Sequence, residues 1–245
     1  LALSGSPVWT IGDSSNATND LSISAIISGT GNLQKDGAGT LALSADNTFT
    51  GYVWITNGTL SVPSIGNLSA ASPLGAQTTA GNGDIYFANG ATTGTLLYTG
   101  TGNTTNRGIR WDTGTGGEIG VIDQSGASGL LKFTGPVNPT VSNMGSVTLR
   151  LQGSTGGTGE LSGVISQLAT TGSTLSIDKA GTGTWTLSGA NTYTGATTIN
   201  DGTLRATTSA SALGAGTLTL AGGTLQMAND TGLACTTGQP PGGLR

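Results

Sequence analysis

The stretch that decides the fold runs from Gly181 to Ala206 and reads GTGTWTLSGANTYTGATTINDGTLRA. Much of it has already appeared at Gly37 to Val62, as GAGTLALSADNTFTGYVWITNGTLSV. In both stretches an apolar residue or Thr occupies almost every second position, which is the period of a strand with one buried face. Glycines interrupt the alternation, and glycine adopts the backbone conformations that tight corners need. The sequence therefore predicts short strands joined by sharp turns.

The two copies align without a gap at an offset of 144 residues (179 − 35), set by Lys35 and Lys179. Leu41/Trp185 and Phe49/Tyr193 are exchanges of similar residues. The identities along the alignment include Gly37/Gly181, Gly39/Gly183, Thr40/Thr184, Leu43/Leu187, Ser44/Ser188, Asn47/Asn191, Thr48/Thr192, Thr50/Thr194, Gly51/Gly195, Ile55/Ile199 and Gly58-Thr59-Leu60/Gly202-Thr203-Leu204. A gapless match of this length indicates a true internal repeat rather than shared composition.

Composition favours an all-β fold. The 245 residues include 44 Gly, only 8% charged residues and no His. Such low charge with a mean hydropathy of +0.04 argues against a disordered chain, which needs high net charge to stay open. No segment carries apolar residues at helical spacing over three turns, so helix has little support.

Short apolar segments recur about every ten to twelve residues and are bounded by Gly, Asn, Asp or Ser. Corners are expected at Asn57-Gly58, Asn89-Gly90 and Asp201-Gly202, where a left-handed residue turns the chain. Aromatic residues make up only 4% of the chain, fewer than a sandwich core usually employs. Coils of ~20–25 residues stacked at ~4.8 Å would give roughly ten coils. We therefore expect residues 1–245 to form a single β-solenoid domain.

The repeated motif closely resembles the autotransporter-associated β-strand repeat, also called the passenger-associated transport repeat. That family's pattern is Lys-x-Gly-x-Gly-Thr, an apolar-x-Leu-Ser step, Asn-Thr-Tyr-Thr-Gly and then Gly-Thr-Leu, and it is met over 33–62 and 177–206. The first copy departs from it at Phe49 and at Tyr52-Val53-Trp54. The resemblance implies a right-handed parallel β-helix that forms the stalk of a large exported bacterial surface protein and assists its secretion.

Several classes of function are disfavoured. A net charge of −4, with eight Lys and Arg spread along the chain, cannot provide a basic stripe for nucleic acid. The apolar runs are far shorter than the ~20 residues of a membrane helix, so we expect no membrane insertion. The single Cys235 cannot form an internal disulfide, and we interpret it as an incidental or interface residue.

We predict no catalytic, cofactor-binding or metal-ligating residues. Most acidic residues lie beside Gly or Asn at expected corners, where the side chain caps its own turn. A pair of carboxylates that hydrolyses glycosides must project from one face. A polysaccharide-degrading site would require convergence of Asp84, Asp112, Glu118 and Asp123.

The densest charge follows Arg107, where Arg110 and Asp112 would share one strand face and form a surface ion pair. The alternative is a sugar-binding or lytic patch there, with Trp111 beside it. Trp54 and Trp185 are expected to fill the core or a corner of the rod rather than to stack on a sugar ring.

Metal sites have little support in the sequence. With no His and one Cys, a local zinc motif is absent. The segment 81–86 is similar to a calcium-binding nonapeptide, but its spacing is wrong and it does not repeat in tandem, so an ordinary corner is favoured. Calcium held between acids of separate coils stays open.

Two hypotheses follow. The first is a non-catalytic, extracellular or cell-surface rod, acting as a stalk or adhesin segment. Its open ends would bind copies of itself or adjacent solenoid domains, because a cut solenoid exposes unpaired backbone groups. Such head-to-tail contacts give an open filament. The second is a glycan-binding or polysaccharide-degrading β-helix. The partners considered are thus other solenoid ends, surface glycans, and host or neighbouring cell surfaces.

Overall fold

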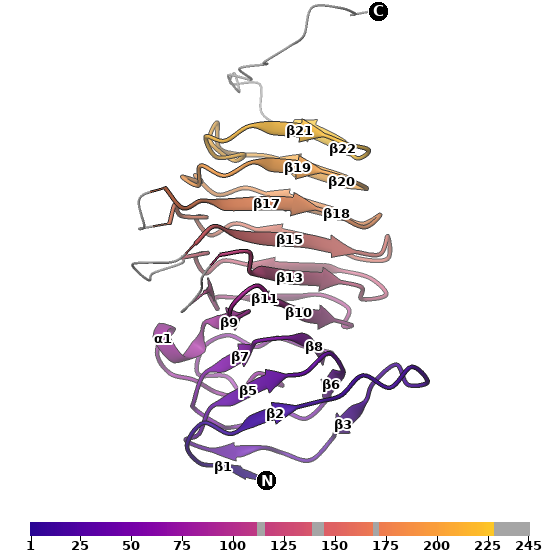
Figure 1. Ribbon diagram of the computed structural model, residues 1–245, viewed down its shortest axis with the longest axis vertical. Helices are drawn as coiled ribbons and strands as arrows, with labels where there is room; N and C mark the ends of the chain where they lie inside the picture. Colours follow the sequence, from indigo (N-terminus) through magenta and orange to yellow (C-terminus); the bar gives the residue numbers. More distant parts are fainter. Residues whose placement is uncertain (112–115, 139–144, 169–171, 228–245) are drawn as a thin grey trace, which may run out of the picture.

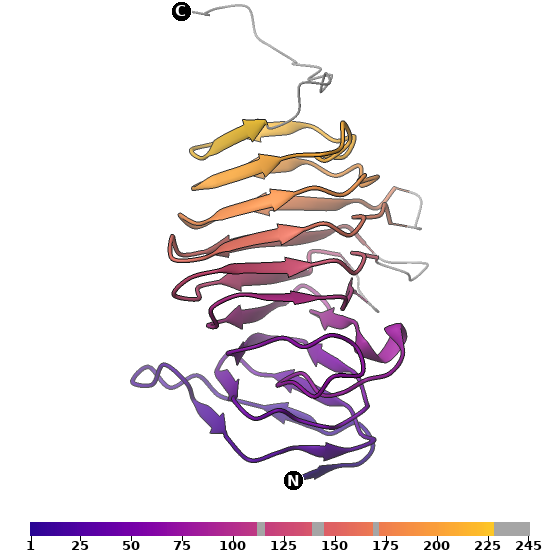
Figure 2. The ribbon, with the colours of Figure 1, turned by 180° about the vertical axis from the view of Figure 1, so that it is seen from behind.

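The computed structural model describes residues 1–111, 116–138, 145–168 and 172–227. Short strands stack in layers along the long axis, from the N-terminus at one end to β21 and β22 at the other (Figure 1). The view from behind shows the same layering (Figure 2). Every ladder between these strands is parallel. The predicted parallel β-helix is confirmed.

Three sheets run along the rod. Sheet I contains β2 (Val8–Thr10), β5 (Leu33–Asp36), β7 (Val53–Ile55), β9 (Ile85–Phe87) and β12 (Ile109–Arg110). Sheet II contains β3 (Leu21–Ile23), β6 (Thr40–Leu43), β8 (Gly58–Val62), β10 (Thr93–Tyr98), β13 (Ile119–Gln124), β15 (Val147–Gly153), β17 (Leu175–Lys179), β19 (Thr197–Ile199) and β21 (Leu218–Leu220). Sheet III contains β11 (Asn103–Thr105), β14 (Leu130–Phe133), β16 (Thr158–Leu161), β18 (Thr184–Leu187), β20 (Thr203–Ala206) and β22 (Thr224–Met227). A separate pair joins β1 (Ala2–Leu3) and β4 (Ser28–Gly29).

The nine strands of sheet II mark nine successive coils, close to the number predicted. Coil length was predicted less well. Within the repeats the register advances by 20 residues, from Leu33 to Val53. Between Leu60 and Leu96 it advances by 36, well beyond the expected 20–25. Between β8 and β10, over residues 63–92, the chain makes a long excursion from the stack of coils. Because β10 then pairs with β8 in register, sheet II stays continuous.

That excursion contains the one helical turn of the described residues, α1 (Ala80–Gly83). The Thr79 hydroxyl caps it by accepting a hydrogen bond from the backbone N–H of Asn82 at 3.4 Å. The sequence analysis predicted an ordinary corner at 81–86. Two glycines in four residues disfavour a helix. The cap and the surrounding packing outweigh that preference.

The core consists of columns of apolar side chains, with one residue added by each coil. Leu41, Leu60, Leu96, Ile122 and Leu151 are consecutive partners in the register of sheet II, and all are fully buried. Outward residues alternate with them, as in β17, where only every second residue is partly exposed. Burial of each such side chain contributes roughly 1.5–3 kcal/mol.

Trp185 lies fully buried in this core, which confirms its predicted place. Its neighbour in the register is Gly159 of the preceding coil. A Cβ atom on Gly159 would lie 2.4 Å from the indole ring. The glycine therefore provides the space into which the largest side chain of the second copy fits.

The two repeat copies occupy different sides of the rod. In the first copy β5 and β7 belong to sheet I, and β6 and β8 belong to sheet II. In the second copy the equivalent strands β17 and β19 belong to sheet II, and β18 and β20 belong to sheet III. The second copy thus begins one sheet farther around the coil than the first, because the 144-residue offset does not correspond to a whole number of coils. Their outward residues consequently line different surfaces.

Candidate functional site

The lysine that opens each repeat is a buried clamp between coils. Lys35 Nζ donates hydrogen bonds to the carbonyls of the next two residues and of Asn57, at 2.8–3.0 Å. Lys179 Nζ makes the equivalent contacts, with Asp201 in place of Asn57, at 2.6–3.1 Å. Both side chains are fully buried. Burial lowers the pKa of each lysine to about 8. The repeat lysine therefore stabilises a corner, and its ammonium group is already hydrogen-bonded to three backbone carbonyls.

The repeat asparagine joins three coils. Asn47 Oδ1 accepts from the backbone N–H of Ile27 at 2.8 Å, and its Nδ2 donates to the carbonyl of Pro73 at 2.9 Å. Asn191 repeats this arrangement in the second copy, accepting from Ile165 N at 2.8 Å and donating to Ala212 O at 2.6 Å. One buried amide thus satisfies backbone groups of the coils before and after its own.

The glycine of the Gly-Thr-Leu step is required by geometry. Gly58 and Gly202 have φ of 69° and 61°, in the left-handed region. A Cβ atom would lie 2.3 Å from the Gly37 carbonyl oxygen in the first copy and 2.5 Å from that of Gly181 in the second. The lysine, the asparagine and this glycine are thus identical in both copies because each contacts a neighbouring coil. No catalytic or binding role is needed to explain them.

Positions at which the two copies differ are therefore the first candidates for a functional site. The departure at Tyr52-Val53-Trp54 places Tyr52 and Trp54 on the outer face of sheet I, beside Tyr86. The ring centroid of Tyr52 lies 6.3 Å from that of Trp54 and 5.5 Å from that of Tyr86. Trp54 Nε1 donates to the carbonyl of Ala88 at 3.0 Å. The prediction that Trp54 fills the core or a corner was wrong. The rings are tilted by 51–67° and pack on each other, so they form no flat platform for a sugar.

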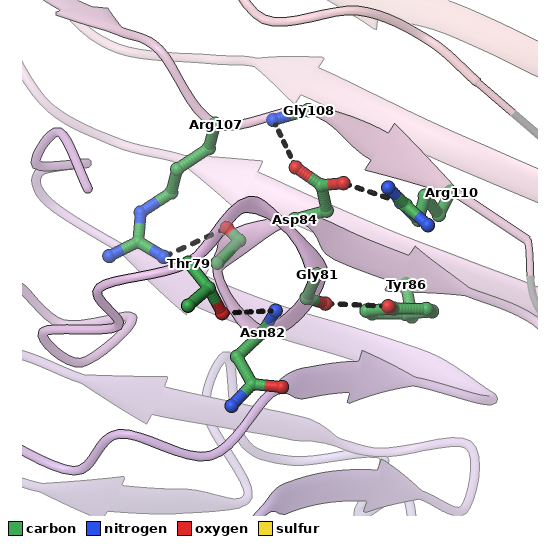
Figure 3. A network of polar contacts seen from close by, with 9 residues as sticks. Thr79, Gly81, Asn82, Asp84, Tyr86, Arg107, Gly108 and Arg110 are labelled. Atoms are coloured by element: carbon green, nitrogen blue, oxygen red, sulfur yellow. Dashed lines mark hydrogen bonds and ion pairs between the residues drawn. The ribbon is translucent and has the colours of Figure 1, made fainter.

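Arg107, which is almost fully buried, anchors the long excursion. Its guanidinium donates to the carbonyls of Gly66, Gly75 and Gly83 at 2.9–3.0 Å and to Gln77 Oε1 at 2.6 Å. Burial lowers the pKa of this group to about 10. Figure 3 shows the side chain reaching from its own coil to the helical turn. The sequence marked this region as charged but did not indicate that Arg107 is internal.

Asp84, which lies between α1 and β9, joins the same network (Figure 3). One carboxylate oxygen accepts from the backbone N–H of Gly108 at 2.9 Å, and the other forms an ion pair with Arg110. We predicted Asp112 as the partner of Arg110. Asp112 lies outside the described residues, and the ion pair seen instead joins neighbouring coils. With both oxygens of Asp84 engaged, the geometry gives no support to a calcium site in this segment.

The other acids proposed for catalysis do not form a pair. Glu118 is buried and accepts from the backbone N–H of Gly116 at 3.3 Å, whereas Asp123 accepts from Ser125 at 2.5 Å and Gln152 at 2.7 Å. Glu118 directly precedes β13 and Asp123 lies near its end, about 16 Å farther along the chain, and the odd spacing places the two side chains on opposite faces. Trp111, proposed to flank a sugar patch, is fully buried.

Across the described ranges, no three or more His, Cys, Asp or Glu residues gather where they could hold a metal ion. Cys235 lies outside the described residues.

The outer face of sheet III carries a polar hollow that sequence reasoning missed. It has a volume of about 430 Å³ and is lined by Lys132, Glu160, Ser162, Thr186, Ser188, Arg205, Thr207 and Thr208. Lys132 and Glu160 form an ion pair of 2.9 Å. These residues come from strands 19 to 28 residues apart, so they meet only once the register of sheet III is known.

The fold is a parallel β-helix in which the repeat lysine, asparagine and glycine connect successive coils. The passenger-associated-transport-repeat family matches residues 33–62 and 177–206, as expected from the sequence. The chain therefore contains two passenger-associated transport repeats. It is also 32% identical, over 208 residues, to the "Adhesin BmaC autotransporter" of Brucella suis biovar 1 (strain 1330).

That alignment covers 80% of this chain but only 5% of the adhesin, so the chain spans a small part of the relative it matches. No solved structure matches the chain. Within the described residues, no helix has the length and apolar character needed to cross a membrane.

Proposed function

We propose that this chain is a non-catalytic rod segment in the surface-exposed passenger of an autotransporter-type adhesin, acting outside the bacterial cell. The observation that carries the proposal is that the lysine, the asparagine and the glycine of the Gly-Thr-Leu step, which are identical in both repeats, all contact the backbone of another coil. Lys179 and Asn191 each bind the backbone of another coil, as do their partners in the first copy. The continuous sheet II further supports a single β-solenoid domain. Likeness to a named adhesin supports the surface location.

We further propose that the open ends of the rod bind other β-helical coils, either of the same longer polypeptide or of a second copy. Among the described residues, the strands β2 and β3 at one end, and β21 and β22 at the other, each have a sheet partner on one side only. An unpaired strand edge is a template for adding another strand. Exposed large apolar side chains lie in the first coil and in these last two strands, namely Leu1, Val8, Leu21, Ile26, Leu220 and Met227.

Electron microscopy and sedimentation of the purified chain test this proposal. We expect rods that lengthen in steps of one chain as concentration rises. Val8→Lys and Ile26→Lys should shift the population to single rods, because charged side chains block edge pairing. Val164→Lys, at an exposed apolar position in the middle of the rod, is the matched control and should leave assembly unchanged. Single rods at every concentration would contradict association between copies.

A further inference from the structure

The hollow on sheet III is built from one outward ladder and one row of hydroxyls. Lys132, Glu160, Thr186 and Arg205 are consecutive partners in the register of β14, β16, β18 and β20. Two residues farther along three of these coils lie Ser162, Ser188 and Thr207, which also line the hollow. Hydroxyls both donate and accept hydrogen bonds. Ser162 and Ser188 already donate, to the Phe133 carbonyl at 3.2 Å and to Glu160 Oε1 at 2.7 Å. The row therefore offers hydroxyl oxygens that still accept hydrogen bonds, spaced by the strand separation of ~4.8 Å.

The charges in the hollow do not balance. Glu160 Oε1 already accepts from Lys132 Nζ at 2.9 Å and from Ser188 Oγ at 2.7 Å. Arg205 is exposed and lies two strands from Glu160, at a backbone separation of about 10 Å. Its guanidinium has no ion pair or hydrogen bond with any other part of the described chain. The hollow thus has one positive charge in excess, on a protein whose formal net charge is −4.

The rim of the hollow is also strained. Thr208 has a φ of 70°, which is rare for a β-branched residue. Residues held in such conformations concentrate at ligand-binding sites. The first copy lacks these features, because Ser61, equivalent to Arg205, is nearly buried and belongs to sheet II. The hollow is therefore specific to the second copy and is no consequence of the repeat itself.

We propose that this hollow binds an acidic saccharide, with the sugar carboxylate on Arg205 and the sugar hydroxyls on the Ser and Thr row. A guanidinium presents two parallel N–H donors that match a carboxylate. The lining residues include no aromatic or large apolar side chain, which favours a polyhydroxylated ligand over an aromatic acid. Its volume lies in the range of small-molecule sites. The proposal does not depend on the rod function proposed above.

Titration calorimetry and amide chemical shifts of the labelled chain test the proposal with three probes: digalacturonate, glucuronic acid and sialyllactose. At least one should bind saturably, with shifts confined to the coils of β16, β18 and β20. Arg205→Gln should weaken binding at least about tenfold, the effect of losing a charged hydrogen-bonding partner. Arg150→Gln is the matched control, because Arg150 is also outward but is paired with Asp178 at 2.7 Å. It should bind as the unmodified chain does.

Neutral lactose, acetate and sulfate complete the experiment. If acetate or sulfate binds as tightly as the acidic sugars do, the hollow is a simple anion site and the proposed saccharide specificity is wrong. If Arg205→Gln binds the acidic sugars as tightly as the unmodified chain, or if no acidic sugar binds saturably, the hollow is not the proposed binding site. Neither result would affect the rod, whose length is measured by microscopy. Because Arg205 is exposed, its substitution should not change the thermal unfolding midpoint, and that measurement confirms that the variant is folded.

Discussion

The phenolic oxygen of Tyr193 lies 2.7 Å from the hydroxyl oxygen of Thr197, and both side chains are buried. In the first copy, 144 residues earlier, the same two positions hold Phe49 and Val53. One copy therefore has both hydroxyls and the other has neither. A buried hydroxyl without a partner costs about 1–3 kcal/mol, which explains why the two positions differ together.

A double-mutant cycle on this pair tests the coupling. We expect Thr197→Val alone to lower the free energy of unfolding by about 1–3 kcal/mol, because it leaves the Tyr193 hydroxyl buried without its partner. The double variant Tyr193→Phe/Thr197→Val reproduces the first copy and should be destabilised by less than the sum of the two single changes. Denaturant unfolding measures all four proteins, and simple additivity would contradict the coupling.

The repeat lysines offer a second test. Lys179→Met should lower the free energy of unfolding by roughly 2–4 kcal/mol, because three carbonyl oxygens lose their donor inside the rod. Lys35→Met should have a similar effect. Lys132→Met is the control, since its partly exposed ion pair with Glu160 contributes about 0–1 kcal/mol. If all three variants unfold alike, the buried clamp has no special role.

The same lysines predict a pH dependence. Their pKa is about 8 in the folded chain, below the ordinary value of 10.5. Between these values the unfolded chain binds more protons than the folded one, so stability rises with pH. The burial penalty on the charged form is fully present below pH 8 and is relieved above it. We expect the unfolding free energy to increase from pH 8 to about 9.5 relative to Lys35→Met/Lys179→Met.

Above about pH 10 the tyrosines act in the opposite direction. Burial raises the pKa of Tyr193 and of Tyr98, so the unfolded chain ionises first and stability falls. The informative range is therefore below the ordinary tyrosine pKa of about 10. Equal pH profiles for the unmodified chain and the double lysine variant in that range would contradict the prediction.

The two-residue period of apolar side chains and the glycines at turns were enough to predict the β-helical architecture. Alternation in 184–187 places Trp185 inside, and the matched glycines Gly58 and Gly202 turn the chain as expected. In a strand as short as β7, however, the pattern does not decide which parity faces inward, and a one-residue shift reverses every side chain. Trp54 was misplaced for that reason.

The surfaces of the rod were less predictable than its core. The role of Lys35 depends on backbone carbonyl oxygens, one of them on the neighbouring coil, and backbone acceptors cannot be recognised in a sequence. The hollow at Arg205 depends on how many residues each excursion inserts between coils. Those insertions vary from coil to coil, so outward neighbours cannot be paired by a fixed period.

The contact between Gly159 and Trp185 gives a final prediction. Gly159→Ala places a methyl group 2.4 Å from the indole, so the rod must shift or the ring must move. Overpacking of this kind costs about 1–3 kcal/mol. Trp185→Leu introduces the residue that the first copy has at Leu41 and frees the space. We expect Gly159→Ala/Trp185→Leu to be more stable than the sum of the single effects predicts, by denaturant unfolding. A Gly159→Ala chain as stable as the unmodified protein would show that the indole has room to move.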